Sequence, residues 1–208
     1  IEKIVYHQEE PIGSTSIIAQ YEVMKLAKEN HINVLLDGQG ADELLAGYIN
    51  YWETYFSQLY RTDRTRYHSE RNSWLELYHT IPFQNDLGFK WRSFHMSSYK
   101  IFSELRRKFA PVTSPVFLGI HPDLVAAFSG RQNPIVKPVS LREHLYSSLM
   151  LRGLGELLRY ADRNAMANSV EVRLPFLFHT LVEFVFTLPD QMLLRNGWTK
   201  HILRKSMR

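Results

Sequence analysis

The sequence contains no cysteine, and this absence removes several kinds of chemistry at once. Disulfide frameworks, thiolate catalysis and cysteine-based zinc or iron–sulfur sites are all excluded. The sequence also lacks an apolar run of about 18 or more residues, the length that a membrane-spanning helix needs. Its opening, IEKIVYHQEE, does not have the pattern of a secretory signal. These absences predict a soluble cytoplasmic protein that does not bind a membrane.

The sequence has little excess charge of either sign. Its 208 residues carry 25 Lys and Arg against 21 Asp and Glu, a formal net charge of +4. This value does not by itself indicate nucleic-acid binding, and it is compatible with a phosphate-bearing small ligand. With 45% hydrophobic residues, the chain is long enough to bury one core. Because it begins at Ile1, without a methionine and in a segment typical of a fold's interior, we expect a fragment.

The first predicted elements are a helix and a strand. Residues 14–30 place apolar side chains at helical spacing, with Ser14 among the candidate N-caps. Residues 32–36, INVLL, form a short apolar run typical of a strand buried on both faces of a parallel sheet. No second strand is evident elsewhere, so we expect the rest of the sheet to lie upstream of Ile1.

The middle of the chain is predicted to contain a helix and two irregular regions. Aromatic residues from Tyr48 to Tyr60 recur at three- and four-residue spacing, which favours core packing on a helix. The polar segment 61–72, RTDRTRYHSERN, has no periodicity and indicates a loop or lid. Prolines punctuate residues 109–140, which indicates short helices and turns.

Helices are also predicted for the last third of the chain. One begins at Ser140, with Glu143 in capping-box spacing. This helix carries Gly153 and Gly155 in its interior, where glycine indicates a close backbone approach. Two further helices are expected over residues 179–188 and 199–207.

Residues 35–48, LLDGQGADELLAGY, join the predicted strand to a helix through a glycine turn. Such junctions lie at the carboxyl ends of strands, where α/β proteins bind ligands, and the helix N-terminus offers free N–H groups to an anion. Neither G-x-x-x-x-G-K-[ST] nor G-x-G-x-x-G is present. Since Asp42 repels a bare phosphate, phosphate binding here requires a divalent cation such as Mg²⁺. Alternatively, Asp42 and Glu43 only complement the helix dipole.

Two long motifs resemble the synthetase domain of glutamine-dependent asparagine synthetases, which are class II glutamine amidotransferases. Residues 35–48 are similar to the family's VVLSGEGADELFGGY pattern, and residues 161–177, ADRNAMANSVEVRLPFL, resemble D-R-x-x-M-x-x-S-x-E-x-R-x-P-F-L. A shorter match is KHILR at residues 200–204, similar to K-x-x-L-R. Residues 7–16 also resemble the stretch before the strand in bacterial members, so the resemblance covers nearly the whole chain.

The resemblance implies an α/β domain of the adenine nucleotide alpha hydrolase-like kind, with helices around a parallel sheet. The chain itself is expected to be predominantly α-helical, with one or two short parallel strands. The implied activity is an ATP-dependent ligase that uses Mg²⁺ and converts aspartate and ammonia into asparagine through an acyl-adenylate. The resemblance also allows a homodimer of the full-length protein.

The resemblance also implies roles for particular residues. The nucleotide is expected beside the turn formed by Asp37, Gly38, Gln39 and Gly40. Asp42 is expected to bind Mg²⁺ on the pyrophosphate, and Lys200 to neutralise charge on the α-phosphate and the leaving pyrophosphate. Arg163 is a candidate to hold the substrate carboxylate.

Simpler interpretations exist for three of these features. Lys200 aligns with Arg204 and Arg208 in a stripe typical of a solvated helix face. Arg163 is equally compatible with an ion pair at a helix end. Glu171 and Arg173 stand among apolar residues and are predicted to be buried, paired and architectural.

The sequence departs from the family in several respects. The pyrophosphate loop S-G-G-x-D-S and the N-terminal glutaminase domain are absent from these residues. We therefore expect that the isolated chain hydrolyses no glutamine and binds ATP weakly or not at all. Gln39 replaces the family's usual Glu, so a general base at this position is unsupported. Phe178 replaces the usual Asp, and nothing in the sequence explains that change.

Two other functions remain open at this point. The first is an amidotransferase of the same family that acts on another carboxylate, in polysaccharide or secondary-metabolite synthesis. The second is a catalytically inactive binding or interaction module. A nucleic-acid binder that uses the basic residues of 61–71 is disfavoured, because neither an RNP-like strand nor a recognition helix accompanies them.

Overall fold

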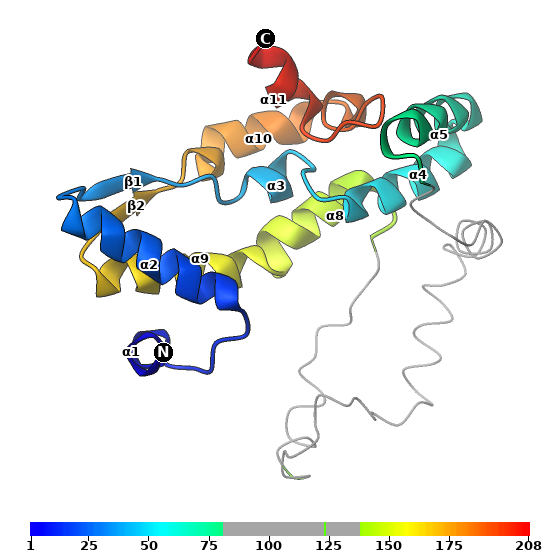
Figure 1. The fold of residues 1–208 in the computed structure, drawn as a ribbon. Coiled ribbons are helices and arrows are strands. Elements are labelled where there is room, and N and C mark those ends of the chain that lie inside the picture. The colour runs from blue at the N-terminus through cyan, green and yellow to red at the C-terminus, as the bar shows by residue number, and fades with distance from the viewer. Residues whose placement is uncertain (81–122, 124–137) are drawn as a thin grey trace.

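The computed structural model describes residues 1–80, 123 and 138–208 (Figure 1). The predicted short helices and turns of 109–140 lie almost entirely outside these residues. The described α-helices are α1 (Glu2–Gln8), α2 (Thr15–Glu29), α3 (Ala41–Leu44), α4 (Asn50–Thr62), α5 (Arg64–Tyr78), α8 (Leu141–Tyr146), α9 (Leu154–Ala167), α10 (His179–Thr187) and α11 (His201–Ser206). The strands are β1 (Val34–Leu36) and β2 (Glu171–Arg173), and the π and 3-10 turns are η2 (Ser147–Leu151), η3 (Pro175–Leu177) and η4 (Asp190–Met192). A predominantly helical chain with a short parallel sheet is therefore confirmed.

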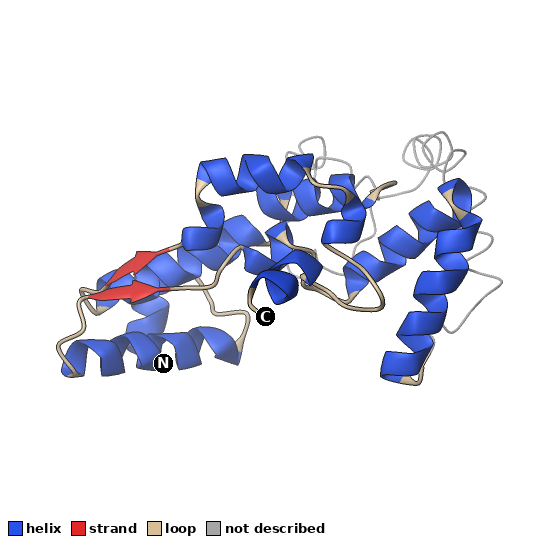
Figure 2. Ribbon diagram, turned by 90° about the horizontal axis from the view of Figure 1, so that it is seen from above, coloured by secondary structure: helices blue, strands red, loops and turns tan. Residues whose placement is uncertain are grey.

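The sheet pairs two segments that are far apart in the sequence. β1 and β2 run parallel, and Leu35 lies opposite Val172. Helices α2 and α9 cover one face, where Leu35 and Val172 pack against Met24, Ala27, Ala165 and Val170. Figure 2 shows the sheet and α2 at one end of the described structure, with α4 and α5 at the other.

The prediction that no second strand lies in the chain was wrong, and so were two predictions about burial at the sheet. Within residues 1–80, 123 and 138–208, only one face of β1 is covered, and Val34 and Leu36 on the other face are 44% and 75% exposed. Glu171 and Arg173 are exposed rather than buried, and they pair with each other at 2.7 Å. The alternation of polar and apolar residues in β2 therefore marks a strand with one wet face.

Helix α2 follows the prediction closely. The hydroxyl of Ser14 caps the helix by accepting a hydrogen bond from the N–H of Ser16 at 3.2 Å. The side chains buried at helical spacing are Ile17, Tyr21, Met24 and Ala27. This apolar face fixes α2 against α9 and so sets the place of β1.

The main core is aromatic and lies between α4 and α5. The predicted aromatic stripe is confirmed for its buried members, Tyr51, Trp52, Tyr55, Phe56 and Leu59. The ring of Trp52 lies 5.3 Å from that of Trp74 on α5. The prediction of a loop at 61–72 was wrong, because the chain turns at Asp63 and continues as α5. The Asp63 carboxylate caps α5 by accepting from the N–H of Arg66 at 2.9 Å.

The helix predicted from Ser140 is interrupted. Its start is confirmed, since the Ser140 hydroxyl accepts from the N–H of Glu143 and the Glu143 carboxylate accepts from the N–H of Val139. After η2, the chain breaks at Gly153, which has φ 72° and precedes α9. A Cβ at Gly153 or Gly155 would meet no atom within 4 Å. Close backbone approach is therefore not the reason for these glycines, and Gly153 provides the positive φ at the break.

The last two helices pack against the aromatic core. α10 packs Leu181, Val182 and Phe186 against that core, and Val185 is fully buried. α11 follows Lys200, whose φ is 52°. Among the described residues, no helix is both long and apolar enough to cross a membrane. A cytoplasmic location stays a prediction.

Candidate active site

The site begins where β1 ends. The N–H of Asp37 donates to the carbonyl of Arg173 at 2.9 Å, so the sheet pairing continues into the glycine turn. The Asp37 carboxylate then accepts from the N–H of Gln39 at 3.2 Å, which folds the turn back on itself. Gly38 has open space around it, as a backbone surface for a ligand requires.

Gly40 connects this turn to α3 and must be a glycine for two reasons. Its φ of 85° lies in the left-handed region that side chains rarely adopt. A Cβ at this position would also overlap the side chain of Leu177, which belongs to η3 just after β2. The turn therefore contacts both strand segments, through the pairing of Asp37 with Arg173 and the packing of Gly40 against Leu177.

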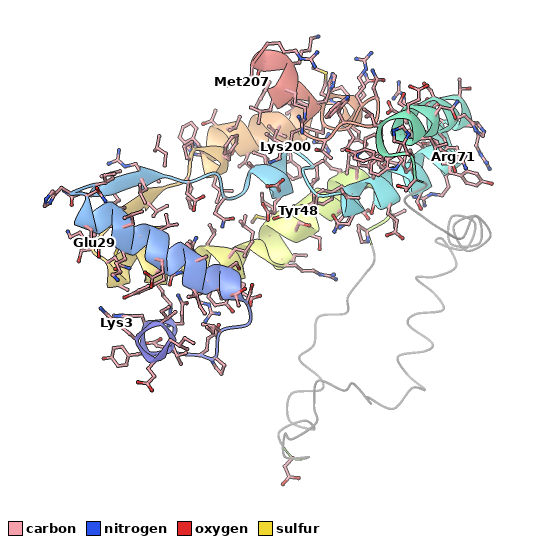
Figure 3. The ribbon with its side chains drawn as sticks, in the orientation of Figure 1. Lys3, Glu29, Tyr48, Arg71, Lys200 and Met207 are labelled. Atoms are coloured by element: carbon pink, nitrogen blue, oxygen red, sulfur yellow. The ribbon has the colours of Figure 1, made fainter. Side chains whose placement is uncertain are left out.

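The central feature of the site is an ion pair between Asp42 and Lys200. The ammonium of Lys200 lies 2.8 Å from Oδ1 of Asp42, and the two side chains are 25% and 37% exposed. Lys200 lies next to α3 in Figure 3, although it is far from α3 in the sequence. The structure thus brings together the predicted metal ligand and the predicted catalytic cation.

Gly47 lies directly against this ion pair. Its N–H donates to the carbonyl of Asp42 at 2.8 Å, which closes the turn after α3. A Cβ at Gly47 would overlap Oδ1 of Asp42 and Cε of Lys200. The pair therefore occupies the space that any other residue's side chain would fill. No role for Gly47 was predicted from the sequence, although this glycine lies within the LLDGQGADELLAGY motif.

Glu43, the second acid of α3, has a different environment from Asp42. It is 4% exposed and accepts a hydrogen bond from the hydroxyl of Tyr48 at 2.9 Å. Burial, together with this hydrogen bond, raises the pKa of the Tyr48 phenol, which therefore remains a donor at neutral pH. Glu43 thus fixes the chain after α3, whereas Asp42 faces partly into solvent. Sequence reasoning missed Tyr48 as a partner because the pair forms across a turn.

Arg163 does not contact the Asp42–Lys200 pair. Its guanidinium lies 2.7 Å from the carboxylate of Glu9 and donates to the carbonyls of Gln8 and His7 at the end of α1. This is the helix-end ion pair that was the alternative interpretation from the sequence. A contact between Arg163 and a substrate carboxylate stays a prediction.

The oxygen ligands of the site suit a phosphate-bound cation and not a protein cage. Among residues 1–80, 123 and 138–208, there is no group of three or more His, Asp or Glu that could hold a metal. Asp42 offers one carboxylate, of which Oδ1 already contacts Lys200. Mg²⁺ commonly takes one or two carboxylates and fills its remaining positions with phosphate oxygens and water. Asp42 fits that arrangement as a single ligand.

Comparison with known proteins adds independent evidence. A family model described as asparagine synthase matches residues 1–208. Asparagine synthetase (glutamine-hydrolyzing) 1 of Bacillus subtilis is 28% identical over 222 residues, covering 98% of this chain and 32% of that protein. A putative asparagine synthetase (glutamine-hydrolyzing) of Mycobacterium tuberculosis is 27% identical, covering 99% of this chain and 31% of that protein.

A third relative has a higher identity over a shorter stretch. Asparagine synthetase (glutamine-hydrolyzing) 3 of Bacillus subtilis is 41% identical over 66 residues, which is 32% of this chain and 11% of that protein. The chain spans about a third of the length of the first two relatives. No solved structure matches the chain significantly.

Proposed function

The chain belongs to the asparagine synthase family, and on that premise we propose that it forms one wall of the active site of an ATP-dependent ligase. The reaction proposed is the conversion of aspartate and ammonia into asparagine through an acyl-adenylate. The family assignment confirms the resemblance inferred from the motifs. The aspartate acceptor, ATP with Mg²⁺, the ammonia supply from a glutaminase domain and a homodimer are parts of the proposal.

The observation that carries this proposal is the ion pair between Asp42 and Lys200 at the end of β1. The carboxylate of Asp42 is suited to the metal of a metal–nucleotide complex, and the ammonium of Lys200 is suited to its phosphates. Formation of an acyl-adenylate places negative charge on the α-phosphate and the leaving pyrophosphate, and a positioned ammonium stabilises that charge. Lys200 contacts the carboxylate of Asp42 on α3, the helix that follows the glycine turn.

The neighbouring residues support the same assignment. Mg²⁺ would be held by Asp42 together with phosphate oxygens, and it would screen the phosphate charge from the carboxylate. The nucleotide would lie along Asp37, Gly38, Gln39 and Gly40, where open space surrounds Gly38. Within the pair, each residue keeps the other neutralised until a ligand supplies new partners.

Ammonia as the nitrogen donor agrees with the residue at position 39. Gln39 is neutral and cannot serve as a general base at neutral pH. Ammonia is already nucleophilic and needs less help than an amide nitrogen. The proposal therefore requires no base from the glycine turn.

The test is pyrophosphate release by the full-length protein, with aspartate and ammonia as substrates. Lys200→Ala should lower the rate about 100-fold, as does removal of a single group that stabilises transition-state charge. Lys200→Arg should retain part of the activity because it keeps the charge. Asp42→Asn should also lose activity, and its activity should not be restored by higher ATP alone. Lys205→Ala on the exposed side of α11 is the matched control and should behave as wild type.

The alternatives give different results in the same assay. Release of pyrophosphate with another carboxylate, and not with aspartate, would keep the ligase chemistry and change the acceptor. No turnover with any carboxylate would favour an inactive binding module. Full activity in folded Lys200→Ala and Asp42→Asn would reduce the pair to a structural salt bridge and contradict the proposal.

A further inference from the structure

A tight hairpin precedes Lys200 by only a few residues. Arg195 and Trp198 exchange backbone hydrogen bonds of 3.1 and 2.9 Å, with Asn196 and Gly197 at the tip. Both tip residues have positive φ, 50° and 74°. Asn-Gly is the sequence most suited to this two-residue turn, because both residues tolerate the left-handed region. The hairpin is therefore a rigid local structure.

The tip of the hairpin lies against α5. A Cβ at Gly197 would come within 2.7 Å of the side chain of Leu77 and within 3.3 Å of the backbone of Trp74. The N–H of Gly197 donates to the carboxylate of Glu70 at 3.4 Å. Thus α5 contacts the hairpin by close backbone packing and by one buried acceptor.

Glu70 is an unusual residue for the position that it occupies. It is 6% exposed, and a buried carboxylate requires polar partners to offset the loss of water. Burial raises the pKa of the Glu70 carboxyl, while the N–H groups of Gly197 and Asn196 and the charge of Arg66 act in the opposite direction. The main partners of this carboxylate therefore belong to the hairpin.

The base of the hairpin is fixed as firmly as its tip. Leu193 and Leu194 are fully buried, and the N–H of His201 donates to the carbonyl of Leu193 at 2.9 Å. Lys200 lies between these anchors with a φ of 52°, a conformation that is uncommon for a lysine. The path of the backbone from 193 to 201 is what directs its ammonium to Asp42.

We propose that Glu70 is a positioning residue for Lys200: its carboxylate holds the tip of the 195–198 hairpin and thereby places the Lys200 ammonium against Asp42. This role rests on the proposed function for its effect on catalysis. The proposed effect on the position of Lys200 rests only on contacts in the structure. These are the hydrogen bond from Gly197 to Glu70 and the ion pair of Lys200 with Asp42. Both effects are therefore measured in the same full-length variants.

The kinetic test uses Glu70→Ala. Misplacement of a catalytic group lowers the rate steeply, so kcat should fall about tenfold while the KM for aspartate stays nearly unchanged. Glu70→Gln keeps an oxygen at the same reach and should recover most of the activity. Glu76→Ala removes a carboxylate from the exposed side of the same helix and should have wild-type kcat. In a Lys200→Ala background, Glu70→Ala should cause no further loss.

A chemical test probes the position of Lys200 and does not require enzyme activity. Acetylation of lysines by a small reagent, followed by mass spectrometry, should modify the paired Lys200 more slowly than the exposed Lys205. In Glu70→Ala, the rate at Lys200 should rise severalfold while that at Lys205 stays constant. Glu76→Ala should leave both rates unchanged. This measurement remains valid if the protein has no ligase activity.

The outcomes separate the two proposals. Faster labelling of Lys200 in Glu70→Ala without any turnover in wild type would support the positional role and contradict the proposed function. Unchanged labelling together with unchanged kcat would overturn the role of Glu70, as would independent losses in the double variant. If Glu70→Ala does not fold, Glu70→Asp takes its place. Its shorter side chain draws the acceptor away from Gly197, so it should show the loss that Glu70→Gln does not.

Discussion

At the scale of single residues, the candidate site depends on the absence of a side chain at Gly47 as much as on its charges. Gly47 has no side chain, and the Asp42–Lys200 pair fills the space beside it. The acids of α3 are adjacent in the sequence and yet have different neighbours, since Glu43 is buried against Tyr48. One acid therefore stabilises the turn, and the other remains available to a ligand.

His144 gives a prediction about pH at this scale. Its Nδ1 lies 2.8 Å from the hydroxyl of Thr54, and its ring packs edge-on against Tyr51. Burial, followed by the charge of Arg152, lowers the pKa of His144 below its ordinary value of 6.5. Between the two pKa values, the folded protein binds fewer protons than the unfolded protein. The free energy of unfolding should therefore rise with pH through this window. The contribution of His144 to stability is lost progressively as the pH falls below 6.5.

Urea unfolding between about pH 5 and about pH 8 measures this dependence. His144→Gln should flatten the part of the slope that lies just below the ordinary histidine pKa. His68→Gln, on the exposed side of α5, serves as the control and should retain the wild-type slope. A slope in His144→Gln equal to that of wild type would contradict the assignment.

At the scale of elements, the break between η2 and α9 distinguishes two neighbouring glycines. Gly153 has φ 72°, whereas Gly155 lies inside α9, and neither has an atom near its missing Cβ. Gly153→Ala should lower the free energy of unfolding by about 1–2 kcal/mol, because alanine is strained at this positive φ. Gly155→Ala should raise it by at most about 0.5 kcal/mol, because Gly155 lies in the first turn of α9, where helix propensity matters less than in the interior. Urea titration of both variants checks the opposite signs, and a shared sign would show that the break is not maintained by Gly153.

Some elements were predictable from local sequence and others were not. α2 has both a cap and a periodic apolar face, so its prediction needed no other part of the chain. α5 was taken for a loop because its exposed positions are charged, and only Tyr67, Glu70 and Trp74 are buried. β2 is three residues long and alternates in polarity, which is too short a pattern to separate from a loop.

The residues of the candidate site were predictable from the sequence, but the contacts between them were not. The glycine turn and Asp42 follow from the strand, turn and helix pattern, and Lys200 followed from the family resemblance. Their pairing depends on tertiary structure, because Lys200 reaches α3 through a hairpin that packs on α5. The same holds for Arg163, whose contacts with α1 no local pattern indicates.

At the scale of the whole molecule, residues 1–80 and 138–208 interlock. β1 pairs with β2, α2 packs on α9, and α4 packs on α8 (Figure 1). One face of the sheet nevertheless remains uncovered in the described structure, where Val34 and Leu36 are exposed. Exposed apolar strands favour pairing with other chains.

This exposure predicts concentration-dependent association of the 208-residue chain. Leu36→Lys should shift the chain towards monomer, because a charge on a strand opposes the approach of another strand. Tyr6→Lys is the control, since Tyr6 is 78% exposed but lies on α1, away from the sheet. Sedimentation velocity over a concentration series gives the result. Association that is equal in wild type and Leu36→Lys would place the contact elsewhere.

The Asp42–Lys200 contact joins two residues that are added to the chain at different times during synthesis. A ribosome completes α3 early, but a nascent chain that has reached only Thr199 carries Asp42 without its counter-charge. A product that stops there lacks the N–H of His201, which donates to the carbonyl of Leu193, and also lacks Ile202 and Leu203, which pack against the aromatic core. It lacks the cation proposed to face the phosphates. Premature termination near this point should therefore remove the ion pair together with part of the packing that supports residues 193–201.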